Sequence, residues 1–279
     1  MTIAVIGVGL IGGSMAITLK EKGFVQKVIG VDASEEHAKQ AVELGLVDFC
    51  TSLENAVDEA DIILLATPIG AAEKLLPQIL DRVKKQVVFD VGSTKSSICS
   101  VIANHPNRKR FVASHPMWGT ENSGPAAAVK DAFVKKATVI CNKEDSDTEA
   151  VELVEKLYGL LNMHILYMNS TDHDMHVAYI SHISHITSFA LANTVLEKEK
   201  EEDAIFELAS GGFESTVRLA KSNPEMWVPI FIQNKDNVLD VLNELIAQLR
   251  KFKSCLEKEN YEYLEELIVK ANGIRRILK

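Results

Sequence analysis

The motif G-V-G-L-I-G at residues 7–12 follows directly after a short apolar run, Thr2–Ile6. A buried strand, a G-x-G-x-x-G turn and a helix, here expected over Met15–Lys22, form the first unit of a dinucleotide-binding fold. The first glycine is expected to make the tight turn, the second to admit a pyrophosphate, and the third to let helix and strand pack closely. The helix N-terminus offers amide donors and a positive dipole end to the phosphates. The predicted cofactor contacts in this turn are Gly7, Gly9, Leu10, Ile11 and Gly12.

A second predicted strand, Lys27–Val31, ends in Asp32, about 20 residues past the last glycine of the motif. A carboxylate at this spacing is typical of one that binds the 2′-hydroxyl of a ribose. It would repel a 2′-phosphate, and the following residues 33–36 offer no arginine to hold one. We therefore expect NAD, not NADP, as the cofactor. A glycine turn used only for packing is the alternative.

Strand and helix patterns continue to alternate along the first half. Near-continuous apolar runs at Asp61–Ala66 and Gln86–Val91 are typical of strands covered on both faces. The pattern predicts an α/β fold with an N-terminal Rossmann-type, doubly wound, mostly parallel sheet. Ligands bind such sheets at the carboxyl ends of the strands, so Thr67, Pro68 and Ser93 are predicted to contact the cofactor. A cap on the following helix is an equally weighted alternative for Ser93.

The stretch Val112–Gly124 lies between this nucleotide-binding half and the remainder of the chain. It holds one histidine, His115, directly before Pro116. Histidine has an unperturbed pKa of about 6.5, so near neutral pH it is suited to accept a proton. We expect the chemistry to take place at His115.

From about residue 170 the pattern changes to helices alone. We therefore predict two domains, 1–169 binding the dinucleotide and 170–279 forming an all-helical substrate and dimerisation domain. Thr171–Leu196 is expected to be one long helix, apolar nearly all round and hence buried. Gly211–Phe213 is expected to be a turn, and Pro229 to kink or restart a helix. Long apolar-striped helices after a dinucleotide domain often pack against a second copy, so we expect a homodimer.

Polar side chains on the long helix share one face, within about one third of its circumference: Asp174, Ser181, His182, His185 and Ser188. A polar stripe on a buried helix needs partners or a ligand. His182 and His185 are expected to face a ligand, with satisfied core histidines as the first alternative. A metal pair is least favoured because no cysteine or carboxylate stands at metal-like spacing, so no metal is predicted. His173 and His176 are expected to be surface-facing or structural.

Composition limits the partners and the compartment. The chain of 279 residues has a formal net charge of −9, which argues against nucleic acid or an acidic membrane as the main partner. A small anionic ligand remains compatible through local basic groups. Cys50, Cys99, Cys141 and Cys255 are widely spaced, as expected for reduced thiols in a cytosolic protein. With no leader pattern and no apolar run of roughly 18 residues, we expect a cytoplasmic protein without membrane contact.

Three motifs occur in order after the glycine turn: S-H-P-M-W-G-T-E-N-S-G at 114–124, S-H-I-S-H at 181–185, and G-G-F-E-S-T-V-R-L-A-K-S-N-P-E-M-W at 211–227. With them the chain resembles the prephenate/arogenate dehydrogenase family over essentially its whole length. The resemblance implies NAD-dependent oxidative decarboxylation of prephenate to 4-hydroxyphenylpyruvate in tyrosine biosynthesis. Conversion of arogenate to tyrosine stays open as the alternative. The resemblance also implies an active site between the two domains.

The resemblance further implies roles for single residues. His115 corresponds to the catalytic hydrogen-bond acceptor, and Ser93 to the serine that orients histidine and cofactor. Arg218 corresponds to the arginine that binds a substrate carboxylate, with a structural pairing to Glu214 as its alternative. Trp118 departs from the family, where many members have a small residue. The implied substrate-binding residues are His182, His185, Arg218, Thr120, Glu121, Trp227 and Gly211.

Two rival functions remain to be weighed. A hydroxyacid dehydrogenase with a helical second half would carry a catalytic lysine on the long interdomain helix, but the buried part of Thr171–Leu196 has histidines instead. A non-catalytic NAD sensor would have no need to keep His115, Ser93, His185 and Arg218 together. Both rivals are therefore less favoured than the dehydrogenase.

Overall fold

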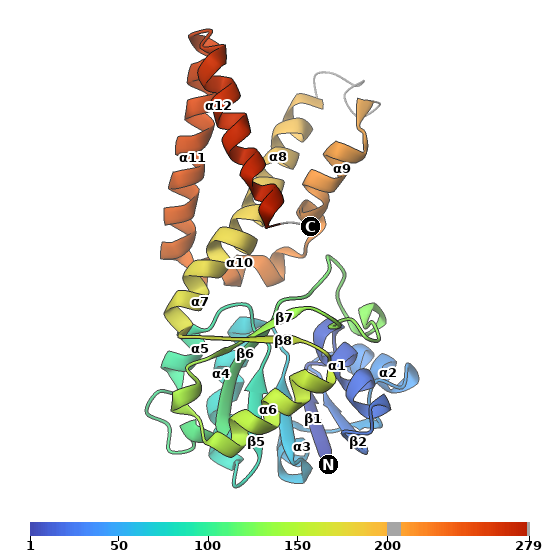
Figure 1. The fold of residues 1–279 in the computed structure, drawn as a ribbon. Helices are drawn as coiled ribbons and strands as arrows, with labels where there is room; N and C mark the ends of the chain where they lie inside the picture. The colour runs from blue at the N-terminus through green and yellow to red at the C-terminus, as the bar shows by residue number, and fades with distance from the viewer. Residues whose placement is uncertain (200–207, 278–279) are drawn as a thin grey trace.

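The computed structural model describes residues 1–199 and 208–277. Its first half is a twisted sheet with helices on both faces, and its second half is a group of helices rising from one edge of that sheet (Figure 1). The described strands form one sheet of eight strands in the order β3-β2-β1-β4-β5-β6-β7-β8. Their bounds are β1 Thr2–Ile6, β2 Lys27–Val31, β3 Phe49–Cys50, β4 Ile62–Leu65, β5 Val87–Asp90, β6 Phe111–Pro116, β7 Ala137–Cys141 and β8 His164–Met168.

The sheet is doubly wound around β1. This strand pairs in parallel with β2 on one side and with β4 on the other, so the strand order reverses there. Such a reversal opens a crevice at the carboxyl ends of the strands. The parallel pairing extends from β3 to β6, whereas β7 is antiparallel to β6 and β8 is parallel to β7. The predicted Rossmann-type, mostly parallel sheet is confirmed.

Helices cover both faces of the sheet, with bounds α1 Leu10–Glu21, α2 Glu35–Glu43, α3 Leu53–Glu59, α4 Ile69–Arg82, α5 Ser96–Val101 and α6 Thr148–Leu160. On one face, Met15 of α1 and Tyr158 of α6 belong to a buried cluster. On the other face, Leu76 of α4 belongs to a second cluster. Neighbouring residues of β1 enter different clusters, Val5 the first and Ile6 the second. This two-sided burial is the reason for the near-continuous apolar runs in the sequence.

The glycine turn after β1 requires glycine at two positions. Gly7 has φ +98°, and a Cβ there would lie 2.6 Å from the carbonyl oxygen of Ala66. A Cβ on Gly12 would lie 2.1 Å from the carbonyl oxygen of Gly7. Any larger side chain would therefore push α1 away from the sheet. The tight turn and the close helix–strand packing expected from the motif are both present.

The helical half begins at Ser170, next to the sheet edge. Its bounds are α7 Ser170–Val177, a π-helical turn at Ala178–His182, α8 Ile183–Glu199, α9 Gly211–Val217, α10 Pro224–Gln233, α11 Lys235–Glu257 and α12 Tyr261–Ala271. Turns of 3₁₀ helix follow α9 at Arg218–Lys221 and α12 at Asn272–Arg276. α11 and α12 form a hairpin that extends away from the sheet (Figure 1).

Two helix boundaries differ from the prediction. Thr171–Leu196 is not one regular helix, because the π-helical turn at Ala178–His182 inserts an extra residue into its path. Gly211–Phe213 is not a turn, since α9 begins at Gly211 itself. Glycine lowers helix propensity but does not forbid a helical start, so composition alone misplaced this boundary.

The helix does not break at Pro229, as expected, but five residues later. Pro229 is the sixth of the ten residues of α10, where its ring removes a single backbone hydrogen bond. The chain leaves helical geometry at Asn234 instead. The Asn234 side chain donates to the carbonyl oxygen of Asp174 (2.7 Å) and to Nδ1 of His182 (3.1 Å). These tertiary hydrogen bonds explain the position of the break.

The predicted burial of Thr171–Leu196 holds in its first part, where His173, Asp174, Val177, Ala178 and His182 are buried. It is wrong for α8 in a single chain. In the described part of α8, Ser188 is the one buried residue. Apolar side chains on these helices face outward instead, among them Tyr179, Ile180, Leu196, Val228, Ile232, Leu249, Leu256, Ile268 and Val269. The helices of one chain are too few to cover one another, which leaves a large apolar surface.

A buried ion pair supports the sheet edge beneath His115. Lys95 Nζ binds the Asp90 carboxylate and donates to the carbonyl oxygen of Ser114 at 2.8 Å. The Lys95 and Asp90 side chains are 0% and 1% exposed. We expect Lys95→Met to lower the free energy of unfolding by about 3–5 kcal/mol, because it leaves a buried carboxylate without its cation.

Urea denaturation of Lys95→Met and wild type would measure the effect from the two midpoints. Lys39→Met is the matched control, since Lys39 pairs with Glu43 at side-chain exposures of 79% and 62%. An exposed pair of this kind is worth less than about 0.5 kcal/mol. Equal midpoints for the two variants would refute the expectation.

Candidate active site

The candidate residues of the first half gather at the carboxyl edge of the sheet. Gly7 follows β1, Asp32 follows β2, Thr67 follows β4 and Ser93 follows β5. His115 lies in β6, opposite Val139 of β7, and is 9% exposed. Parallel strands bring their carboxyl ends to one edge, so the sheet topology assembles residues that are far apart in sequence.

The crevice beside β1 has the features of a dinucleotide site. A Cβ on Gly9 would meet one atom within 4 Å, the amide nitrogen of Gly124 at 3.9 Å, so the backbone there has room for a ligand. The Asp32 carboxylate accepts from the amides of Val8 (3.1 Å) and Ser34 (3.0 Å) at the end of β2. Thr67 Oγ1 is buried without a hydrogen-bond partner in the described structure. A glycine cradle, a fixed carboxylate and an unpaired hydroxyl fit the phosphates, ribose and amide of a dinucleotide.

The helix-cap alternative for Ser93 is wrong. α5 begins at Ser96 after Lys95, and no side chain of this segment caps it. Instead, the Asp174 carboxylate accepts from the amides of Lys95 and Ser96, both at 2.8 Å. The cap of α5 therefore comes from α7 in the helical half. Ser93 itself is half-buried between the end of β5 and this cap.

His115 is hydrogen-bonded into a chain of buried polar groups. Its Nδ1 lies 2.9 Å from Nε2 of His173, and Nδ1 of His173 lies 2.8 Å from Oδ1 of Asp174. The expectation for His173 is therefore wrong in its surface-facing form, because this residue is 1% exposed. His176 is exposed. α7 packs against α5 and β7, and its residues His173 and Asp174 are buried there.

Burial determines the protonation of this histidine. Desolvation lowers the pKa of His115 well below its ordinary value of about 6.5, and the neighbouring His173, Lys95 and His182 lower it further. The His115 imidazole is therefore neutral near pH 7. A neutral imidazole in a dry site is able to accept a hydrogen bond or a proton.

His182 fits the alternative of a core histidine whose hydrogen bonds are made within the protein. It is 1% exposed, and Asn234 donates to its Nδ1 at 3.1 Å. Burial lowers the pKa of His182 to about 4, so it is neutral near pH 7. Its ring meets the ring of Trp227 edge-to-face, with centroids 6.0 Å apart. These contacts hold the His182 ring against the side chain of Trp227.

The rings of His185 and Trp227 stack on each other. Their ring centroids are 3.4 Å apart, and the planes meet at 26°. Nδ1 of His185 donates to the carbonyl oxygen of Ser181 (3.0 Å), because a carbonyl oxygen only accepts. Trp227 also packs in a buried cluster with Ile69, which starts α4 just after Thr67 and Pro68. The stacked pair thus lies close to the carboxyl end of β4.

Arg218 connects the helical half to the loop after β6. Among the described residues its ion-pair partner is Glu121, at 3.1 Å, and not Glu214. The side chains of Arg218 and Glu121 are 51% and 27% exposed, so this ion pair is open to solvent. The Trp118 ring packs on Phe133, with centroids 5.2 Å apart.

Two other candidates lie at the margin of this group. Thr120 Oγ1 accepts from the amide of Asn122 at 3.2 Å, within the loop. Gly211 is exposed at the start of α9, apart from the hydrogen-bonded chain around His115. The structure brings His115, Ser93, Thr67, His185 and Trp227 toward one edge, whereas Gly211 remains on its outskirts.

Sequence reasoning missed several residues at the core of the site. They are Asp90, Lys95, His173 and Asn234, together with the cap formed by Asp174. Lys95 lies in the G-S-T-K turn beside Ser93, and Asp90 ends a buried strand, so both positions carried a signal. A charged residue within a strand that is otherwise apolar needs a buried partner.

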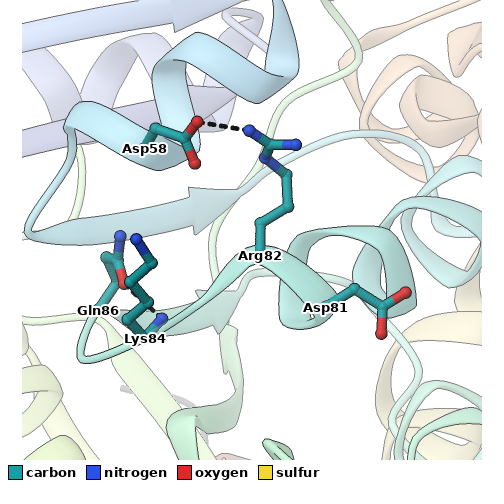
Figure 2. Close-up of a pocket in the computed structure, with 5 residues that line it drawn as sticks. All are labelled: Asp58, Asp81, Arg82, Lys84 and Gln86. Atoms are coloured by element: carbon teal, nitrogen blue, oxygen red, sulfur yellow. Dashed lines mark hydrogen bonds and ion pairs between the residues drawn. The ribbon is translucent and has the colours of Figure 1, made fainter.

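A separate open depression lies at the opposite edge of the sheet, where α3 and α4 end and β5 begins (Figure 2). It is lined by Asp58, Asp81, Arg82, Lys84 and Gln86, and Arg82 pairs with Asp58. Most of these side chains are exposed and charged. This is an ordinary solvated surface, away from the carboxyl ends of the strands.

In the described residues, no group of histidine, cysteine or acidic side chains is arranged to hold a metal ion. No described helix is long and apolar enough to cross a membrane.

Comparison with known proteins identifies both halves of the chain. Residues 15–167 match the family model of the prephenate dehydrogenase nucleotide-binding domain, and residues 169–270 match that of the prephenate dehydrogenase dimerization domain. The chain is 33% identical to the prephenate dehydrogenase of Bacillus subtilis over 94% of this chain and 72% of the relative. It is 30% identical to the cyclohexadienyl dehydrogenase of Zymomonas mobilis over 99% of this chain and 96% of the relative.

Solved structures give the same result. Prephenate dehydrogenase from Aquifex aeolicus, in complex with hydroxyphenyl propionate and NAD+, superimposes with a TM-score of 0.90 at 28% identity, covering 100% of this chain and 98% of that one. The arogenate dehydrogenase of Synechocystis superimposes with a TM-score of 0.79 at 28% identity, with both chains fully covered. The two domain models match in order, and one relative is 33% identical over 94% of this chain. This protein therefore belongs to the prephenate/arogenate dehydrogenase family.

Proposed function

We propose that this dehydrogenase catalyses the NAD-dependent oxidative decarboxylation of prephenate to 4-hydroxyphenylpyruvate. One observation carries the proposal: a buried, neutral His115 lies at the carboxyl edge of the dinucleotide-binding sheet, where the helical half meets that edge. Membership of the family sets aside the rival hydroxyacid dehydrogenase. Arogenate is the second candidate substrate, because the relatives include a cyclohexadienyl dehydrogenase and an arogenate dehydrogenase.

The residues at the sheet edge suit a cofactor with a free ribose 2′-hydroxyl. Asp32 presents its carboxylate at the end of β2, and Gly7, Gly9, Leu10, Ile11 and Gly12 form the turn that would hold the pyrophosphate. Thr67, Pro68 and Ser93 would line the nicotinamide end of the crevice. When bound there, NAD supplies the acceptor for the hydride.

His115 would accept the proton of the ring hydroxyl as the hydride leaves the carbon that bears it. When the ring carboxylate departs as CO2, its bonding electron pair enters the ring and passes to the oxygen. His115 then returns the proton to that phenolate oxygen. The net change is loss of CO2 and of one hydride, with no net release of a proton. Ser93 would orient the hydroxyl and His115 for this exchange.

The substrate carries two carboxylates, so the pocket needs cationic and polar groups at its mouth. Arg218 would bind one carboxylate through its guanidinium in place of Glu121, its partner in the free chain. His185 would contact the substrate from its stack on Trp227, which would line the pocket. His182 would support the Trp227 side chain through its edge-to-face contact. Thr120 and Glu121 stay predictions for the pocket entrance, and Gly211 stays a predicted substrate-binding residue.

Two domains would share this work. Residues 1–169 would bind the cofactor, and residues 170–279 would bind substrate and dimerise. The outward apolar side chains of α8, α10, α11 and α12 provide the surface that a second copy would cover. The matched description of this half as a dimerization domain supports a homodimer.

Side-by-side turnover of prephenate and arogenate, each with NAD and with NADP, tests the proposed activity. NADH or NADPH formation is followed by absorbance. We expect kcat/KM to be highest for prephenate with NAD. A preference for NADP would remove the proposed role from Asp32. A preference for arogenate would transfer the function to the second candidate.

Replacing His115 tests the proton acceptor. We expect His115→Asn to lower kcat by about 10²–10⁴, because positioned acid–base catalysis contributes that much. The Kd for NAD, measured by fluorescence titration, should stay within about twofold, since His115 makes no part of the glycine turn. A kcat within about threefold of wild type would refute the assignment.

Arg218→Ala tests the carboxylate clamp. A charge-assisted hydrogen bond contributes about 1.5–3 kcal/mol, so KM for prephenate should rise roughly 10- to 150-fold. Arg82→Ala is the matched control, because Arg82 also pairs with a surface aspartate but lies at the opposite sheet edge (Figure 2). An unchanged KM in Arg218→Ala would mean that the arginine is structural.

A further inference from the structure

The hydrogen-bonded chain behind His115 contains two groups that the proposed chemistry has not yet used, His173 and Asp174. Both lie in α7, and they are 1% and 3% exposed. The rings of His115 and His173 meet edge-to-face, with centroids 5.1 Å apart and planes at 70°. One nitrogen of each ring lies next to the other ring, with His115 Nδ1 2.9 Å from His173 Nε2.

The location of each proton follows from the anionic end of the chain. Burial raises the pKa of Asp174, but hydrogen bonds from His173 and from the amides of Ser96 and Lys95 outweigh it and lower the pKa overall. The carboxylate is therefore ionised near pH 7 and only accepts hydrogen bonds. Nδ1 of His173, at 2.8 Å from it, must carry a hydrogen.

The remaining protons follow in turn. Burial lowers the pKa of His173, although the hydrogen bond to Asp174 partly offsets it, so the ring is neutral near pH 7. With hydrogen on Nδ1, its Nε2 bears a lone pair and accepts. His115 Nδ1 must then be the donor, which leaves Nε2 of His115 with a free lone pair.

We propose that His173 and Asp174 are positioning residues that hold His115 in the Nδ1-protonated tautomer, so that its Nε2 is the atom that accepts the substrate proton. The inference rests on the proposed function, because it assigns the orientation of the same histidine. His173 and Asp174 are both buried and are assigned no contact with substrate or cofactor. They act through His115.

The chain also stabilises the cation formed during turnover. When His115 takes the hydroxyl proton on Nε2, it becomes an imidazolium that still donates through Nδ1 to His173. The negative charge of Asp174 faces that cation through the His173 ring. No proton needs to leave His115 toward His173, so the proton remains available for return to the phenolate.

The test compares His173→Leu with His173→Gln. Leucine removes both hydrogen bonds, whereas the glutamine amide offers an oxygen to His115 Nδ1–H and an N–H to Asp174. We expect His173→Leu to lower kcat at least about 100-fold with the Kd for NAD changed less than about twofold. His173→Gln should recover kcat to within about tenfold of wild type. His105→Leu is the control, since His105 also contacts an aspartate, Asp81 at 3.1 Å, outside the site.

The pH dependence of kcat distinguishes a change in the tautomer of His115 from a change in its pKa. The charged or titratable groups facing His115 are His173 and Asp174 on α7, Lys95 before α5 with its partner Asp90, and His182 in the π-helical turn. The lowered pKa of His115 keeps the ring neutral as pH falls, so activity of wild type should decline only at a pH well below the ordinary histidine pKa. In His173→Leu the loss of kcat should persist from pH 6 to about 9, because a tautomer ratio does not depend on pH. Recovery of kcat at high pH would overturn the proposal.

Imidazole ¹⁵N NMR of the wild-type enzyme gives a readout that needs neither substrate nor a folded His173 variant. Protonated and unprotonated ring nitrogens resonate at well-separated frequencies, and loss of one spin system in His115→Asn assigns the ring. Hydrogen on Nδ1 of His115 supports the proposal, and hydrogen on Nε2 overturns it. A kcat of His173→Leu within about threefold of wild type, or a glutamine variant as slow as the leucine variant, also overturns it.

These outcomes are distinct from failure of the proposed function. Full turnover in His115→Asn, or no oxidation of prephenate by wild type, refutes the proposed function. The NMR result still decides the tautomer in that case.

Discussion

The Asp174 carboxylate is the contact on which the arrangement of the two halves depends. It accepts hydrogen bonds from the amides of Lys95 and Ser96 at the start of α5 and from the ring of His173. A carboxylate at a helix N-terminus also interacts favourably with the helix dipole. Because Asp174 belongs to α7, the same group that caps a helix of the sheet domain also anchors the helical domain. The carboxyl edge of the sheet and the first turn of α7 are thereby held in one geometry.

Burial has opposite consequences for the charged and the neutral groups around this contact. Asp90 and Lys95 are buried as a pair and keep the backbone at Ser114 in place. His115, His173 and His182 have no carboxylate strong enough to offset desolvation, so the pKa of each is lowered. The result is a buried site with neutral imidazoles beside fixed charges. Such an environment strengthens every hydrogen bond within it, and it makes each unpaired polar group costly.

Local patterns predicted much of this protein because they depend on few residues. The glycine turn, the acidic residue after β2 and the two-sided apolar strands are short-range requirements of one fold. His115 was recognisable because a histidine lies in a motif between two unlike halves. The errors fell where distant contacts decide. The helix ends at Asn234 and not at Pro229 because its side chain binds Asp174 and His182, and α8 is exposed because one chain lacks enough helices to cover it.

The amino-acid sequence by itself determined the dinucleotide-binding fold, the change to helices near residue 170 and the family motifs that contain His115, His185 and Arg218. It did so because periodicity and turn chemistry are local. Only the tertiary structure decided which groups surround His115. His173 became part of its hydrogen-bonded chain because the first turn of α7 is enclosed between α5 and β7, and helical periodicity carries no record of what packs against a helix.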